Sequence, residues 1–157
     1  MSVFKPYMKL KRIEDVKLGL LKHLKIKLIL VDIDNTLVEH GLEDISIEVE
    51  HWLNNIKRQG IRLILVSNNS EERVRKFANN VSLTYVSKAN KPFPFKVVKK
   101  LKGYNKSKIL LIGDQVFTDI VFANLLGIRS ILLEPINENE PKNIKLKRIL
   151  ERPLRKN

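Results

Sequence analysis

The chain has 157 residues, of which 43% are hydrophobic and 30% charged, a composition typical of one globular domain with a substantial core. No apolar run approaches the roughly 18 residues of a membrane span, and no apolar stretch follows the basic N-terminus, so we expect neither a transmembrane segment nor a signal peptide. The absence of cysteine excludes disulfides, thiolate chemistry and Cys-ligated zinc, and it fits a cytoplasmic protein.

The net charge of +13 lies almost entirely in two flanking segments. Residues 1–27 contain eight basic and two acidic residues, and residues 141–157 contain seven basic residues and one acidic residue. Residues 28–140 are nearly neutral, with fifteen basic and fourteen acidic residues. The flanks either solvate the chain ends or attach the protein to an anionic partner, nucleic acid or lipid headgroups.

Helical spacing is the main feature of residues 13–24, which predict an amphipathic helix outside the core. The rest of the chain alternates strand and helix patterns. Strands are predicted at 27–33, 61–69, 83–92, 108–115 and 128–134. Helices are predicted at 46–60, 70–80, 95–103 and 116–127, the second opening with a capping box from Asn69 to Glu72.

This alternation predicts an α/β fold, a Rossmann-like three-layer sandwich with a five-stranded parallel sheet wound on both faces. We expect one domain over residues 1–157, with a core at 27–134, a basic N-terminal helical segment at 1–26 and a basic C-terminal segment at 141–157. In such sheets the ligand site lies beyond the carboxyl ends of the strands.

Polar side chains lie at or just beyond the carboxyl end of each of the first four predicted strands, and all should meet at that edge. They are Asp32, Asp34 and Thr36; Ser67, Asn68 and Asn69; Lys91, with Lys88 nearby; and Asp114, Thr118 and Asp119. Mg²⁺ prefers oxygen ligands, and two or three carboxylates suffice. We expect Asp32 and Asp114 to bind Mg²⁺ and Asp119 to support it directly or through water. Such an ion would remove the repulsion between Asp32 and Asp34.

The same groups suit phosphoryl transfer. A charge-neutralised carboxylate can attack phosphorus, while Asp34 can protonate the leaving oxygen and then activate water. Ser67 and Lys91 can hold the transferring oxygens. A receiver-type phospho-acceptor domain uses similar groups, but it needs an aspartate after the third strand, where this chain reads "SKANKP".

The segments "DIDNT", "VSNN", "NKP" and "GDQVFTD" resemble the four ordered motifs of the haloacid dehalogenase-like (HAD) phosphatases, over residues 28–134. More closely, they resemble the YqeG-like group of subfamily IIIA, whose relatives include phosphatidylglycerophosphate phosphatases. The resemblance implies a capless fold and an aspartyl-phosphate intermediate. It implies Asp32 as nucleophile, Asp34 as acid/base and Lys91 as the motif lysine, because Lys91 precedes Pro92. The expected metal residues are Asp32, Asp34, Asp114 and Asp119, and the expected phosphate-binding residues are Thr36, Ser67, Asn68 and Lys91.

The gaps from Asp34 to Ser67 and from Ser67 to Lys91 are too short for a cap domain, so we expect an open site suited to a substrate attached to something large. The resemblance implies phosphatidylglycerophosphate, an intermediate in phosphatidylglycerol synthesis. The N-terminal mixture of Phe4, Tyr7 and Met8 with basic residues could rest on an anionic membrane, at its inner face, with the 13–24 helix either joining it or packing on the domain.

The sequence leaves three alternatives open: a phosphatase of nucleic-acid termini, a phosphatase of phosphoproteins, and a phosphate-binding module without turnover. An aromatic content of 6% and the lack of an RNA or DNA module argue against the first. The intact Asp34 argues against the last, because a binding module has no use for a general acid.

Overall fold

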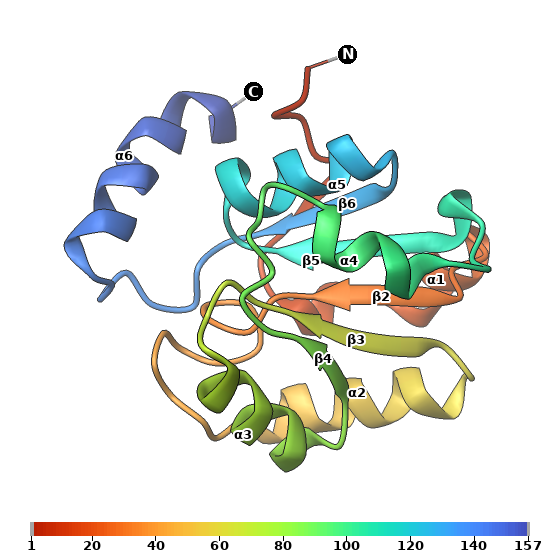
Figure 1. The fold of residues 1–157 in the computed structure, drawn as a ribbon. Coiled ribbons are helices and arrows are strands. Elements are labelled where there is room, and N and C mark those ends of the chain that lie inside the picture. Colours follow the sequence, from red (N-terminus) through yellow and green to blue (C-terminus); the bar gives the residue numbers. More distant parts are fainter. Residues whose placement is uncertain (1, 157) are drawn as a thin grey trace.

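The computed structural model describes residues 2–156, which build a parallel sheet of six strands in the order β1-β6-β5-β2-β3-β4 (Figure 1). The strands are β1 (Met8–Leu10), β2 (Leu28–Val31), β3 (Arg62–Val66), β4 (Thr84–Val86), β5 (Ile109–Gly113) and β6 (Arg129–Leu133). The helices are α1 (Leu18–His23), α2 (Ile47–Arg58), α3 (Glu71–Val81), α4 (Phe95–Val98), α5 (Val121–Leu126) and α6 (Lys142–Lys156). Short turns of helix occur at η1 (Ile13–Asp15), η2 (Lys99–Leu101), η3 (Lys106–Lys108) and the π-helical η4 (Val116–Ile120).

The strands are apolar on both faces because helices cover both sides of the sheet. In β2, Ile29 and Val31 pack with residues of α1, α2 and α3, whereas Leu28 and Leu30 pack with residues of α4 and α5. This alternation follows from the two-residue period of a strand. The predicted three-layer α/β architecture is confirmed.

The sheet has one strand more than the predicted five. The extra strand, β1, pairs in parallel with β6 at the sheet edge, with Met8 opposite Ile131. The predicted amphipathic helix at 13–24 is also wrong, because this stretch divides into η1 and α1. Its apolar residues Ile13, Val16 and Leu21 are buried in the core, and they are therefore not available to a membrane.

The basic C-terminal segment forms a helix, α6, beyond the carboxyl ends of the strands (Figure 1). It contacts η4, so it belongs to the folded body and is not simply a solvated flank. Among residues 2–156, no helix is both long enough and apolar enough to cross a membrane.

Candidate active site

Three buried carboxylates meet where β2 and β5 end. One oxygen each from Asp32, Asp114 and Asp119 lie within 4.8 Å of one another. The neighbouring strands bring the first two together, because Val31 pairs with Ile112, and Asp32 and Asp114 follow these residues by one and two positions. Asp119 enters from η4 over Gly113, where a Cβ would lie 2.5 Å from its Oδ2 atom. The glycine therefore makes room for the third carboxylate.

Lys91 is the cation of this cluster. Its Nζ atom donates to Asp32 at 2.9 Å and to Asp119 at 2.5 Å. Burial alone would lower the pKa of the ammonium, but the two carboxylates raise it above its ordinary value, so Lys91 stays charged. Asn68 fixes the lysine backbone by accepting from its N–H at 2.7 Å and donating to its carbonyl at 3.0 Å.

Burial raises the pKa of Asp32 well above its usual range, although Lys91 opposes the shift. Burial also raises the pKa of Asp114 to about 6, although Arg148 opposes the shift. Crowded, buried carboxylates of this kind are stabilised in the ionised form by a hard divalent cation, which takes oxygen ligands. The chemistry of Asp32, Asp114 and Asp119 fits such an ion.

Asp34 lies outside this group of carboxylate oxygens. Its side chain accepts from Arg73 at 2.8 Å, from Asn69 at 2.8 Å and from the backbone N–H of Gly41 at 2.9 Å. Asn69 is therefore not the predicted cap of α3. Ser70 is the cap, and its hydroxyl accepts from the N–H of Arg73. The arrangement orients the Asp34 carboxyl beside the pocket without placing it among the three clustered carboxylates.

The cluster opens into a pocket of about 310 Å³. Its lining contains most of the predicted site residues: Asp32, Asp34, Ser67, Asn68, Lys91 and Thr118. Thr36 is buried below it, and its hydroxyl donates to Asp114 at 3.4 Å. Lys88 is exposed. A larger cavity, of about 640 Å³, lies beside Tyr7 and Arg129 and contains none of these residues, so the chemistry points to the smaller one.

Several site contacts come from the C-terminal part of the chain, for which the sequence predicts solvation or attachment to an anionic partner but no role in the site. Arg148 bonds the carboxylates of Asp114 and Glu140, and Glu140 accepts from Asn35 at 2.5 Å. Burial would raise the pKa of Glu140, but Arg148 lowers it below its ordinary range. Lys147 also lines the pocket. The spacing of the charges along this segment indicates a helical face, but nothing local places that face on Asp114.

Comparisons with known proteins agree with this geometry. A family model described as mitochondrial PGP phosphatase matches residues 1–137. The probable phosphatase YqeG of Bacillus subtilis is 32% identical over 134 residues, covering 84% of this chain and 78% of its own length.

Among solved structures, a hydrolase from Streptococcus pneumoniae aligns with a TM-score of 0.56 at 17% identity, over 81% of this chain and 99% of that one. The cobalt-bound deoxy-D-mannose-octulosonate 8-phosphate phosphatase of Haemophilus influenzae aligns with the same TM-score at 12% identity, over 80% and 77% of the two chains. These two matches establish the fold. With the family match and the YqeG relative, they make the chain a HAD-type phosphatase that belongs to the mitochondrial PGP phosphatase family.

Proposed function

We propose that the protein removes the terminal phosphate of phosphatidylglycerophosphate and so produces phosphatidylglycerol. The assignment of this substrate rests on the family match over residues 1–137. The chemistry of the pocket supports a substrate of this type. A polar cavity of about 310 Å³ lined by Lys91, Lys147 and His40 suits an anionic headgroup, while the acyl chains stay outside.

In the proposed reaction, an oxygen of the Asp32 carboxylate attacks phosphorus, and the bond from phosphorus to the glycerol oxygen breaks. Asp34 gives that oxygen a proton, and phosphatidylglycerol leaves. Asp34 then takes a proton from water, which attacks the aspartyl-phosphate, releasing inorganic phosphate and restoring Asp32. Lys91 and Ser67 hydrogen-bond the transferring oxygens.

We assign the ion to Mg²⁺, held by Asp32, Asp114 and Asp119. When bound, it supplies positive charge that offsets the repulsion between the anionic substrate and the carboxylates. Lys91 remains the fixed positive charge that this chain provides itself. Its ion pair with Asp32 holds the attacking carboxylate at the pocket wall.

A lipid substrate implies work at a membrane surface, and we propose peripheral contact with an anionic leaflet, in the cytoplasm at the inner membrane face. The buried positions of Ile13, Val16 and Leu21 remove the N-terminal helix as the contact.

The test is phosphate release from a substrate panel: phosphatidylglycerophosphate in mixed micelles, 3′- and 5′-phosphorylated oligonucleotides, phosphopeptides and a soluble aryl phosphate. Each is measured with Mg²⁺ and with EDTA, for the wild type and Asp32→Asn. We expect the lipid to give the highest kcat/KM, with activity lost in EDTA and in the variant. Preference for an oligonucleotide or phosphopeptide would overturn the substrate, and activity of Asp32→Asn would overturn the mechanism.

A further inference from the structure

Helix α6 is attached to the protein by its charged side, which is the reverse of an ordinary surface helix. The side chains of Arg148, Glu151 and Arg155 are only 14%, 0% and 21% exposed. Leu146 and Leu150, in contrast, are 59% and 58% exposed. The helix therefore presents apolar side chains to the outside and buries ionic ones.

The inner contacts fix this orientation. Arg148 bonds the carboxylate of Asp114, and Arg155 bonds its backbone carbonyl. Glu151 accepts from the backbone N–H of Phe117 at 3.0 Å. Turning the leucines inward would break these contacts and leave the buried carboxylate of Asp114 without Arg148, and a buried unpaired charge is costly. The exposed apolar stripe is thus a stable feature of the fold.

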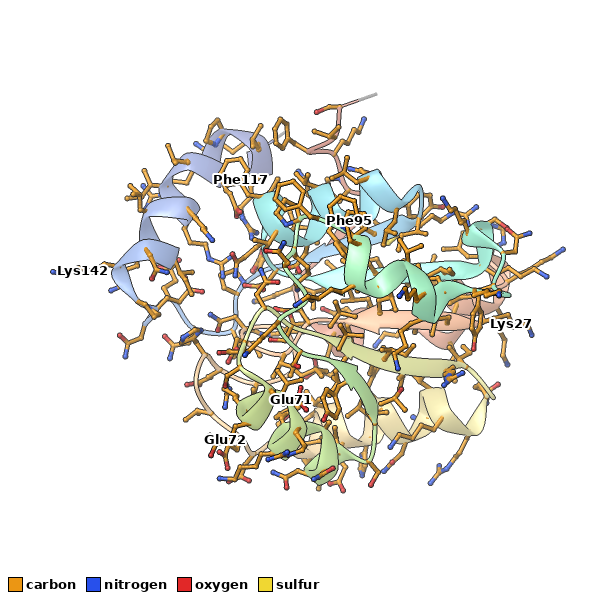
Figure 2. The ribbon with its side chains drawn as sticks, viewed as in Figure 1. Lys27, Glu71, Glu72, Phe95, Phe117 and Lys142 are labelled. Atoms are coloured by element: carbon orange, nitrogen blue, oxygen red, sulfur yellow. The ribbon has the colours of Figure 1, made fainter. Side chains whose placement is uncertain are left out.

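The outer face has the composition of a surface that binds anionic lipid. Its apolar residues recur three and four positions apart and so form one stripe: Leu146, Ile149 and Leu150. Exposed basic residues flank the stripe: Lys142, Lys145, Arg152 and Lys156. Lys142 points away from the body of the protein (Figure 2). The one acidic residue of the helix, Glu151, is buried.

We propose that the outer face of α6 docks on an anionic lipid surface, with the leucines in the boundary of the acyl chains and the lysines among the headgroups. This proposal rests on the lipid substrate proposed above. The helix lies outside residues 1–137, the part that the family match covers.

The composition of this face favours an anionic lipid surface over a second copy of the chain or a nucleic acid. A second copy docked through the same face would bring two basic helices together, with no exposed acid on either to pair them. A nucleic acid would neutralise the lysines but would leave Leu146, Ile149 and Leu150 in water. An anionic bilayer would accommodate both the apolar stripe and the basic residues of this face.

Docking here would also position the substrate. Pro141, Asn143, Ile144 and Lys147, at the start and along one side of α6, line the pocket beside Asp32. The helix that would rest on the membrane therefore forms a wall of the cavity in which the phosphate would be cleaved. A headgroup could enter while its acyl chains remain in the bilayer.

The test compares the wild type with Leu146→Gln/Leu150→Gln, which keeps residues that favour a helix. Leu125→Gln is the matched control, since Leu125 is 51% exposed in α5 and does not line the pocket. Sedimentation uses phosphatidylcholine vesicles with and without phosphatidylglycerol, at low and high salt. Activity is measured on phosphatidylglycerophosphate in those vesicles and on a soluble aryl phosphate.

We expect wild-type binding that needs the anionic lipid and weakens in high salt, and a loss of about 10- to 100-fold in vesicle affinity for the double variant. Hydrolysis of vesicle substrate should fall in parallel, while hydrolysis of the soluble ester and all properties of Leu125→Gln should match the wild type. Unchanged vesicle binding by the double variant overturns the proposal. The proposal is also overturned if the wild type does not bind vesicles and is instead a dimer that the double variant makes monomeric. The same holds if the wild type does not bind vesicles but binds an oligonucleotide that the double variant no longer binds.

The two proposals fail separately. Binding to vesicles through α6 without hydrolysis of phosphatidylglycerophosphate would keep the docking surface and remove the substrate. Hydrolysis of the lipid in micelles by a protein that does not bind anionic vesicles would support the proposed substrate and exclude the docking surface.

Discussion

Replacing Glu151 with alanine should release α6 from the protein. The carboxylate is fully buried, accepts from the N–H of Phe117 at 3.0 Å, and lies 3.5 Å from Arg155 and 3.9 Å from Arg148. Removing one partner of a buried ion pair costs about 3–5 kcal/mol. Because the two arginines retain 21% and 14% exposure, we discount this to about 2–3 kcal/mol.

Such a loss would raise the population with α6 detached by roughly 30- to 150-fold, since 1.4 kcal/mol is a factor of ten. Hydrogen exchange read by mass spectrometry should show faster exchange confined to residues 142–156. Glu151→Gln retains an acceptor for Phe117, so its α6 exchange rate should lie between those of the wild type and Glu151→Ala. Glu134 is exposed, so Glu134→Ala should exchange at the wild-type rate. Unchanged exchange in α6, or an equal increase in β2 and β5, would show that Glu151 does not hold α6 on the protein.

Three further outcomes follow from the site. Gly113→Ala should place a methyl group against Asp119 and lower the free energy of unfolding by about 1–3 kcal/mol, seen as a drop in Tm of roughly 3–10 °C; an unchanged Tm contradicts it. In EDTA, raising the pH from about 4 to 6 should destabilise the wild type relative to Asp114→Asn by about 2 kcal/mol, because the pKa of Asp114 is about 6 in the folded state and 3.8 ordinarily, so the folded state retains a proton that the unfolded state has lost; urea titrations that show no such divergence exclude it. Arg73→Met should remove one of three donors to Asp34 and lower kcat by about tenfold with little change in KM, and a change confined to KM would argue for substrate binding instead.

The convergence of Asp32, Asp114 and Lys91 could be predicted from sequence because parallel strands end at one edge of a sheet. Asp32 and Asp114 follow aliphatic runs whose length and composition define a strand, and Lys91 lies in the loop after β4. The position of Asp119, five residues after Asp114 and six after the end of β5, also follows from local pattern. These contacts depend on topology that the alternation of elements already implies.

Other features depend on contacts distant in the chain. Strand β1 has three residues and no distinctive pattern, and only β6 makes it a strand. The apolar residues at 144–154 do have helical spacing, but spacing predicts an inward apolar face. The reversal in α6 depends on Asp114 and Phe117, more than thirty residues away. The orientation of Asp34 similarly depends on Arg73, 39 residues along.

In the proposed mechanism, Asp32 carries the phosphoryl group between two steps, and Asp34 acts as acid in the first and as base in the second. Asp34→Asn, incubated with phosphatidylglycerophosphate and Mg²⁺ and then quenched in acid, tests it most directly by peptide mass spectrometry. We predict one phosphoryl group on the peptide that contains Asp32, and none on Asp32→Asn/Asp34→Asn treated in the same way. Phosphate released by Asp34→Asn at the wild-type rate, or a phosphoryl group on any other residue, would contradict the proposed mechanism.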